Sequence, residues 1–367
     1  MTWYLVANGD RIASPALLIY PDRIGENVRR MIELAGGPMR LRPHVKTHKM
    51  SEVVRLQQAA GIDKFKCSTI AEAEMVAACG ASDVLLAYAP VGPNIDRLLR
   101  LVAKFPNTRF STVSDDADHV DALSAAATGA CVELEVLLDI DNGMHRSGIV
   151  PGDAAEQVYR RIASSRSLRP GGLHVYDGHL RDSDLAARRL EVERAFAPVD
   201  TLRERLLAAN LPVPRVVAGG TFSYPIYASR GDIECSPGTT VLWDYSYSTK
   251  VPDLEFLHAA MLLTRVVSRP VGNRLCLDLG YKAVSPDNPE RRVFFPDLPD
   301  ARMVNHSEEH LVIETAEASR FALGDALYAI PWHVCPTVAL HAEAHVIENG
   351  RAVGTWQVVA RQRRITI

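Results

Sequence analysis

The first 245 residues alternate between two sequence patterns, one typical of strands and one typical of helices. This alternation restricts the possible fold more than any other feature. Eight short runs rich in apolar or β-branched residues read as strands: 39–45, 64–70, 83–89, 109–114, 132–140, 171–177, 214–220 and 233–243. Stretches with helical spacing lie between several of them, at 50–61, 71–80, 94–105 and 186–210. A strand followed by a helix, repeated eight times, predicts an α/β fold with a (β/α)8 TIM-type barrel. A doubly wound open sheet is the alternative, but no strand is followed by G-x-G-x-x-G.

The sequence pattern changes after about residue 250. The runs 257–270, 274–284, 310–316, 326–334, 338–350 and 356–367 read as strands separated by turn residues, and helical spacing is nearly absent. Asn349-Gly350 suits a type I′ hairpin turn. We therefore predict a barrel domain over 1–248 and an all-β domain over 249–367, with the extreme N-terminus a candidate to join the β domain.

Charge and cysteine spacing exclude several classes of protein. The net charge is −3, so no basic face for nucleic acid is expected. No apolar run approaches the ~18 residues of a membrane span, and the N-terminus lacks the pattern of a signal peptide. The six cysteines are scattered without a C-x-x-C pair, which favours a reducing, cytoplasmic setting.

Polar groups and glycines are concentrated where the predicted strands end, which is where a (β/α)8 barrel carries its active site. Lys46 is the strongest candidate among them for a catalytic residue, because it follows the first run and lies between His44 and His48. A lysine that is partly removed from water offers a nucleophilic amine. A surface lysine is the alternative interpretation, and the flanking histidines argue against it.

Two glycine-rich turns suggest a phosphate site. Gly219, Gly220 and Thr221 follow the seventh run, and Gly238 and Thr239 follow the eighth. Phosphate sites of barrels are commonly formed by the loops after strands seven and eight. With a lysine across the barrel, this arrangement suggests pyridoxal phosphate, whose aldehyde would bond to Lys46.

A possible metal pair lies in the predicted β domain. His333 and Cys335 are two residues apart on an expected strand, so their side chains should point to one face. Imidazole and thiolate suit zinc or a similar divalent ion, and water or substrate would complete the coordination. His341 is a weaker candidate ligand, and a buried histidine beside a small apolar cysteine is the alternative.

These motifs resemble a known family. Residues 42–49, Arg-Pro-His-Val-Lys-Thr-His-Lys, are similar to the pyridoxal-lysine motif of the D-threonine aldolase and D-serine dehydratase family, and the resemblance covers nearly the whole chain. It implies fold-type III pyridoxal phosphate enzymes with an alanine-racemase-like barrel, a C-terminal β domain and a homodimer. Arg146 and Tyr176 correspond to residues beside the cofactor. Gly219-Gly220-Thr221 corresponds to the phosphate turn, and 333–337 to the H-x-[CD]-P-T metal motif.

The chain departs from the family pattern in three places. Cys335 stands where aldolases carry Asp, which favours a dehydratase, although the general texture resembles D-threonine aldolases. Asp177 follows Tyr176 where aldolases present a histidine base, and His179 is the nearest substitute. Ala339 and Ala342 replace the Asn and Asp that often surround the last histidine.

The expected function is that of a lyase on β-hydroxy-D-amino acids, with Lys46, His179 and Tyr176 as catalytic residues. Retro-aldol cleavage to glycine and an aldehyde is preferred over dehydration of D-serine or 3-hydroxyaspartate to a 2-oxo acid and ammonia. The cofactors are pyridoxal 5′-phosphate and zinc, or manganese or magnesium. An amino-acid racemase ranks lower because it needs no metal pair. A non-catalytic pyridoxal phosphate carrier would leave the β domain unexplained.

Overall fold

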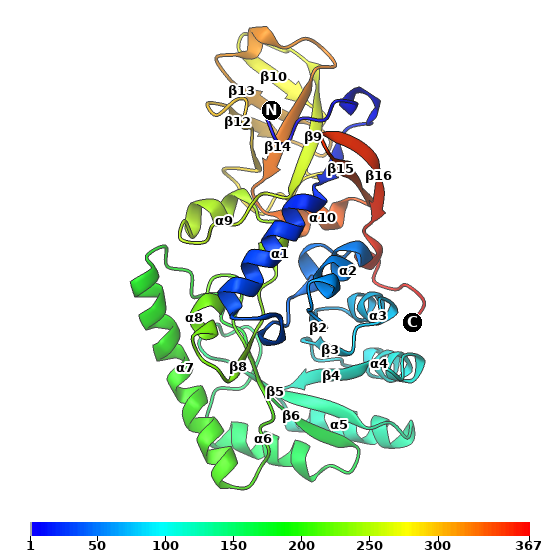
Figure 1. Cartoon of the computed structure of the whole chain (residues 1–367), viewed down its shortest axis with the longest axis vertical. Helices are drawn as coiled ribbons and strands as arrows, with labels where there is room; N and C mark the ends of the chain where they lie inside the picture. Colours follow the sequence, from blue (N-terminus) through cyan, green and yellow to red (C-terminus); the bar gives the residue numbers. More distant parts are fainter. Residues whose placement is uncertain (1) are drawn as a thin grey trace. The chain divides into compact units, whose positions relative to one another are not determined.

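The computed structural model describes residues 2–367, and its internal contacts divide the chain into two compact units (Figure 1). The sheet unit contains residues up to Val28, Thr47–Val53 and Thr239–Arg361. The barrel unit contains Arg29–Lys46, Val54–Gly238 and Gln362–Ile367. The division thus falls between Gly238 and Thr239, ten residues before the boundary expected between 248 and 249, and the N-terminal segment groups with the sheet unit.

The barrel unit is built on seven parallel strands that neighbour one another in chain order, from β2 to β8. Their bounds are β2 (Lys64–Cys67), β3 (Asp83–Leu86), β4 (Arg109–Ser114), β5 (Leu134–Ile140), β6 (Leu168–Val175), β7 (Val216–Ala218) and β8 (Ile233–Cys235). The helices that follow the strands are α3 (Ile70–Ala78), α4 (Pro93–Lys104), α5 (Ala117–Gly129), α6 (Asp153–Ser164), α7 (Leu185–Ala208) and α8 (Tyr224–Ala228). Helix α2 (Ser51–Ala59) precedes β2.

The first predicted strand of the barrel is a bridged segment and not a regular strand. Leu41 pairs with Cys235 of β8, and His44 pairs with Lys66 of β2, each as an isolated bridge. Pro43 between them has no N–H to donate, which interrupts regular pairing, although its carbonyl accepts the Lys66 amide at 2.9 Å. Residues 41–44 therefore link the two edge strands of the curled sheet. The barrel prediction is confirmed and the open doubly wound sheet is not.

The sheet unit contains a nine-stranded mixed sheet with the order β12-β13-β10-β9-β1-β15-β16, in which β14 pairs with β9 and β11. Its strands are β1 (Ala16–Ile19), β9 (Ala260–Ser268), β10 (Arg274–Leu277), β11 (Val293–Phe294), β12 (Arg302–His306), β13 (Leu311–Glu314), β14 (Ala326–Pro331), β15 (Glu343–Glu348) and β16 (Arg351–Gln357). Asn349 and Gly350 join β15 to β16 with φ of 49° and 69°, so the type I′ hairpin is confirmed.

Two features of the sheet unit differ from the expectation of an all-β domain. Strand β1 lies between β9 and β15, pairing antiparallel with one and parallel with the other. Residues Val334–Leu340 form helix α10, where a strand was expected. Pro336 stands in the first turn of this helix, where its missing N–H costs no hydrogen bond. Helix α1 (Pro21–Ala35) and helix α9 (Tyr245–Lys250) complete the list of helices.

Each unit buries its own apolar core. Leu85, Val113, Leu137 and Val217 come from four strands of the parallel sheet and form one cluster. In the sheet unit, buried residues from the N-terminal segment pack against β9 and β14: Tyr4, Val6, Ile12, Leu18, Met261, Leu263, Tyr328 and Ile330. Within residues 2–367, no helix is both long enough and apolar enough to span a membrane.

Candidate functional site

Lys46 and Tyr176 come together at the carboxyl ends of the parallel strands, which we call the barrel mouth. Lys46 lies in the 3-10 turn Val45–Thr47, directly after the segment that bridges β8 and β2. Tyr176 follows β6. The Nζ atom of Lys46 lies 5.5 Å from the centroid of the Tyr176 ring. Two residues that are 130 positions apart and were singled out independently are thus neighbours.

The Tyr176 ring is bordered by two further cations. The Arg146 guanidinium carbon lies 4.7 Å from the ring centroid, and the Lys66 Nζ atom lies 5.5 Å from it. The ring also packs on backbone: a Cβ at Gly220 would lie 3.1 Å from its Cε2 atom, and a Cβ at Gly178 would collide with its hydroxyl. Both glycines therefore leave room for the ring. We call Lys46, Lys66 and Arg146 the mouth cations.

Sequence reasoning missed Lys66, although the run KFKC carried a signal. Lys64 and Lys66 are two apart on β2, so they share one face of the strand. In a barrel the outer face of a strand is covered by helices, so these lysines must point inward. Lys66 is 2% exposed, and burial followed by repulsion from Lys46 lowers its pKa to about 7.

An Asp–His pair lies near the mouth cations. Asp139, the sixth residue of β5, and His174 of β6 approach at 2.6 Å between Oδ1 and Nδ1. Burial alone raises the pKa of Asp139, but His174 outweighs it, so the pKa is lowered and the carboxylate stays charged. Burial lowers the pKa of His174. The second ring nitrogen of His174, Nε2, is buried without a partner among the described residues.

Asp177 supports the glycine turn and does not act as an exposed base. Its Oδ1 atom accepts from the Ser223 hydroxyl at 2.6 Å, and its Oδ2 atom accepts from the Tyr227 hydroxyl at 2.8 Å. The Gly220 amide donates to the same Ser223 oxygen at 3.1 Å. Burial raises the pKa of Asp177, against these two hydrogen bonds. The loop after β6 and the loop after β7 are therefore tied together.

His179, the predicted substitute base, lies against the loop after β5. A Cβ at Gly143 would come within 3.2 Å of its Nε2 atom. Its Nδ1 atom is buried without a hydrogen-bond partner among residues 2–367. The loop itself is held by Asp141, which accepts from the amides of Gly143 at 3.0 Å and His145 at 2.9 Å. His179 thus keeps a ring nitrogen available for a proton.

The glycine turns are built as expected, but three of their amides already have acceptors. Gly219 has φ +79°, a conformation that favours glycine, and its N–H donates to the Val175 carbonyl at 3.0 Å. Gly238 donates to the Thr221 hydroxyl at 3.3 Å, and the Gly220 amide is used as described above. Their assignment to a phosphate site stays a prediction.

The barrel mouth suits an anionic cofactor. None of the mouth cations forms an ion pair with a carboxylate of the described residues, because Asp139 and Asp177 are occupied by other donors. The amide group of Asn142 is also buried with both polar atoms unpartnered within that range. Of the three cations, Lys66 is buried, Lys46 is half-buried and Arg146 is exposed. The unpaired buried cation and the unsatisfied amide are costly, and a bound polyanion would relieve both. Pyridoxal phosphate, with Lys46 as the amine for its aldehyde, fits this set of groups.

The predicted metal pair lies in the sheet unit, and the expected strand is wrong. His333 is the N-cap of α10 and Cys335 lies in its first turn, because Asp244 accepts the Val334 amide at 2.9 Å and starts a helix there. The two side chains nevertheless meet, joined by a hydrogen bond. A tight helical turn brings residues i and i+2 together here where the alternation of a strand was expected to do so.

The surroundings of the pair favour a thiolate and a fixed imidazole. His333 Nδ1 bonds to Asp287, which orients the ring and leaves Nε2 as the nitrogen that faces Cys335 and could bind a metal. Burial raises the pKa of Cys335, but His333 and the Thr47 hydroxyl, 3.2 Å from Sγ, lower it overall. Burial by itself lowers the pKa of His333, whereas Cys335 and Asp287 bring it to about 9.

The pair stands without a third protein ligand. Over the described part of the chain, no group of three or more His, Cys, Asp or Glu side chains is arranged to hold a metal. His341 donates instead to the Ala283 carbonyl at 2.8 Å, and Thr239 Oγ1 lies 3.6 Å from Cys335 Sγ. A divalent ion at His333 and Cys335 would keep open positions, as a catalytic ion requires.

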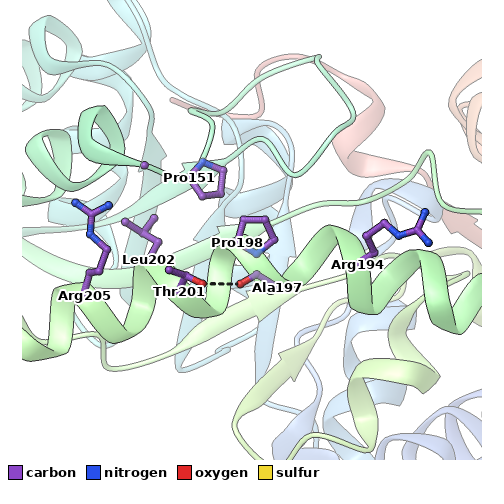
Figure 2. A pocket seen from close by; sticks show the side chains of 8 residues that line it. Pro151, Arg194, Ala197, Pro198, Thr201, Leu202 and Arg205 are labelled. Atoms are coloured by element: carbon purple, nitrogen blue, oxygen red, sulfur yellow. Dashed lines mark hydrogen bonds between the residues drawn. The ribbon is translucent and has the colours of Figure 1, made fainter.

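A surface hollow elsewhere in the barrel unit is not part of this site. It runs along α7 and is lined by Pro151, Arg194, Pro198, Thr201 and Arg205 (Figure 2). The Thr201 hydroxyl donates to the carbonyl of Ala197 at 3.2 Å, next to the proline inside the helix. The hollow contains none of the residues discussed above.

Comparison with protein families gives two adjoining matches. Residues 19–242 match the family described as alanine racemase, N-terminal domain. Residues 259–347 match the family described as putative serine dehydratase domain. The first match spans the whole parallel sheet and Lys46, and the second spans His333 and Cys335.

Individual relatives resemble the chain over nearly its full length. A 3-hydroxy-D-aspartate aldolase of Paracoccus denitrificans is 30% identical, covering 95% of this chain and 92% of the relative. The crystal structure of a D-threonine aldolase from Filomicrobium marinum superposes with a TM-score of 0.89 at 28% identity, covering 96% of both chains. D-threo-3-hydroxyaspartate dehydratase from Delftia sp. HT23 gives 0.83 at 26%, covering 95% and 98%. One structure of that dehydratase is of a cysteine-to-alanine variant described as metal-free.

Proposed function

The chain belongs to the D-threonine aldolase and D-serine dehydratase family of pyridoxal-phosphate-dependent lyases, and on that premise we propose that it cleaves β-hydroxy-D-amino acids to glycine and an aldehyde. The observation that carries the proposal is the meeting of Lys46, Arg146 and Tyr176 at the barrel mouth. An amine and a guanidinium beside one aromatic ring supply what a phosphorylated aldehyde cofactor needs.

The chain's own residues divide the chemistry among them. Pyridoxal phosphate supplies, when bound, an electron-accepting ring conjugated with the substrate Cα. Lys46 provides the amine that holds the cofactor, and its Nζ atom is the group to move a proton at Cα. Arg146 stays charged and binds an anionic oxygen. His179, whose Nδ1 atom has no partner among residues 2–367, is the group to accept the proton of the β-hydroxyl.

We propose that His333 and Cys335 hold a divalent metal ion, with zinc the first choice and manganese or magnesium the alternatives. The donor set of one imidazole and one sulfur suits zinc. The lowered pKa of Cys335 supports the proposal, because the thiolate is the form that binds metal. Such an ion polarises a hydroxyl group and needs no proton transfer to do so.

A dehydratase acting on D-serine or 3-hydroxyaspartate is the second candidate, and Cys335 is the observation that favours it. The resemblance places a cysteine at this metal position in dehydratases and an aspartate in aldolases. In that reaction Lys46 would take the Cα proton, and a divalent ion held by His333 and Cys335 would supply a Lewis acid for the leaving hydroxyl group. A racemase ranks lower, since it would leave the pair formed by His333 and Cys335 without a task.

Product analysis tests the proposal directly. The purified protein, supplied with pyridoxal phosphate and either zinc, manganese or magnesium, should be incubated with D-threonine, D-serine and D-3-hydroxyaspartate. Glycine with the matching aldehyde supports the aldolase, and a 2-oxo acid with ammonia establishes the dehydratase instead. L-alanine converted to its enantiomer, with no cleavage product from any hydroxy acid, would refute both. We also propose a homodimer, as the family resemblance implies, which light scattering can measure.

A further inference from the structure

Lys66 is the one mouth cation that the proposed reaction does not use. Lys46 holds the cofactor and Arg146 is the expected anion contact, but Lys66 was assigned no role. It lies on β2, is 2% exposed, and its Nζ atom is as far from the Tyr176 ring centroid as that of Lys46, 5.5 Å in both cases. A second amine beside the same ring, and the only buried one of the mouth cations, requires an explanation.

Two other cations of the barrel unit, one fully buried and one partly buried, show what satisfied charges look like here. At the opposite ends of the strands, fully buried Arg42 donates to Asp83 at 2.6 Å and to Glu234 at 2.7 Å. Lys64, two residues before Lys66 on the same strand, donates to Glu234 at 2.8 Å and to the Met39 carbonyl at 2.7 Å. These cations are neutralised by carboxylates of the chain.

Lys66 has no such neutralising partner. Its side chain donates no hydrogen bond and forms no ion pair within residues 2–367, and its Nζ atom lies over the face of Tyr176. Asp139 and Asp177 lie near enough to influence it, but both oxygens of Asp177 accept from Ser223 and Tyr227, and Asp139 bonds to His174 and Ser147. An unpaired buried ammonium is unfavourable, and an anion of a bound ligand would supply the partner that the chain does not.

We propose that Lys66 is an anion-binding residue of the barrel mouth, whose ammonium contacts an oxygen anion of the ligand held there. The anion is either an oxygen of the pyridoxal cofactor or the carboxylate of the amino-acid substrate. The inference rests on the proposed function for the identity of that ligand. It adds a residue to the site and assigns it to positioning the ligand, without a proton-transfer step.

The electrostatics of the unliganded mouth agree with this role. Burial and then the neighbouring Lys46 cation lower the pKa of Lys66, Asp177 and Asp139 oppose the shift, and Arg146 adds to it. The pKa of about 7 means that the amine is charged only in part near neutrality without ligand. A bound anion favours the charged form and raises that pKa, so ligand binding and protonation of Lys66 strengthen each other.

The experiment compares Lys66→Met with Lys64→Met. The two substitutions are chemically identical and lie on the same strand, but only Lys66 faces the barrel mouth. The probe is 4′-deoxypyridoxine 5′-phosphate, which lacks the aldehyde and so binds without bonding to Lys46. Its affinity is measured on the cofactor-free full chain by fluorescence titration, and urea unfolding of the same samples gives stability.

We expect the two variants to change different quantities, probe affinity in one and stability in the other. Lys66→Met should lower probe affinity about 10- to 100-fold, the usual effect of losing a charge-assisted hydrogen bond, while the unliganded protein becomes equally or more resistant to urea. Lys64→Met should weaken the protein, because it leaves Glu234 with one partner fewer, but keep probe affinity within about twofold. Lys66→Arg, which retains the charge, should recover part of the affinity.

A second measurement separates the two sources of the anion. If Lys66→Met binds the probe like wild type but raises the KM for D-threonine about tenfold or more at saturating cofactor, the substrate carboxylate is the partner. If both quantities are unchanged, Lys66 binds no anion and the inference is wrong, while the proposed function stands. If wild type itself binds neither the probe nor pyridoxal phosphate, the proposed function and the inference are both refuted.

Discussion

His48 should make this protein sensitive to acid, because its imidazole is buried and burial disfavours the protonated form. The side chain is fully buried, its Nδ1 atom accepts the Met50 amide at 3.2 Å, and its Nε2 atom has no partner among the described residues. Burial, aided by the adjacent Lys49 cation and opposed by the Met50 hydrogen bond, lowers the pKa of His48 to about 3. In the unfolded chain the same imidazole titrates near pH 6.5.

The direction in which the free energy of unfolding changes with pH follows from proton binding in the two states. Between pH 6.5 and pH 3 the unfolded chain holds a proton that folded His48 does not, so acid favours unfolding. At about 1.4 kcal/mol per pKa unit, the free energy of unfolding loses about 2 kcal/mol at pH 5 and at most about 5 kcal/mol at lower pH. Any folded pKa below about 4 gives the same loss at pH 5, because folded His48 is then neutral at that pH.

The assay is urea unfolding of wild type and His48→Asn at pH 7, 6 and 5. Asparagine does not titrate, and its Oδ1 atom can accept the Met50 amide. Loss of the ring lowers stability by an amount independent of pH, so the stability advantage of wild type should shrink by about 2 kcal/mol from pH 7 to pH 5. The test is the stability difference between wild type and His48→Asn at each pH. The total pH dependence of wild type is not a test, because burial raises the pKa of Asp244 to about 6 and shifts stability in the opposite direction.

The exposed residue His310 supplies the control, since His310→Asn should leave the pH dependence as in wild type. A constant difference between wild type and His48→Asn from pH 7 to pH 5 would show that folded His48 takes up a proton freely. In that case the description of the segment around Lys46 and His48 as buried would be wrong.

The remaining predictions concern the two candidate sites. Lys46→Ala should lose the visible absorption of bound cofactor, and cofactor that stays covalently attached to the variant after borohydride reduction and dialysis would contradict the assignment. Gly220→Val should weaken cofactor binding more than folding, because the added carbons meet the Tyr176 ring; equal cofactor affinity in a folded variant speaks against it. EDTA should remove activity and leave the cofactor absorbance, and Cys335→Asp should move metal preference from zinc toward manganese or magnesium; activity that resists chelation defeats both. Asp287→Asn should reduce metal affinity about 10- to 100-fold by freeing the imidazole that it orients, which equilibrium dialysis with zinc can measure.

Local patterns predicted most of the architecture. The runs that became β2 to β8 were read correctly because a buried parallel strand is a short apolar run followed by a helix, and both signals lie within a few residues. Asn349 and Gly350 specified their turn for the same reason, since both tolerate positive φ. Lys46 was found because the end of a strand is visible in the sequence. The joining of β1 to β9 and β15 had no comparable signal, since pairing between distant segments is decided by the assembled sheet.

The chemistry of the two sites depended more on tertiary contacts. The sequence placed His333 and Cys335 on a strand, but the buried Asp244 carboxylate, 90 positions away, accepts the Val334 amide and starts a helix. Lys66 was passed over because a lysine on a short strand usually faces water, and only closure of the barrel turns it inward. Residue type and local period are properties of the sequence alone. Burial and the supply of partners are set by the whole fold, because they depend on which distant groups fill the space around a side chain.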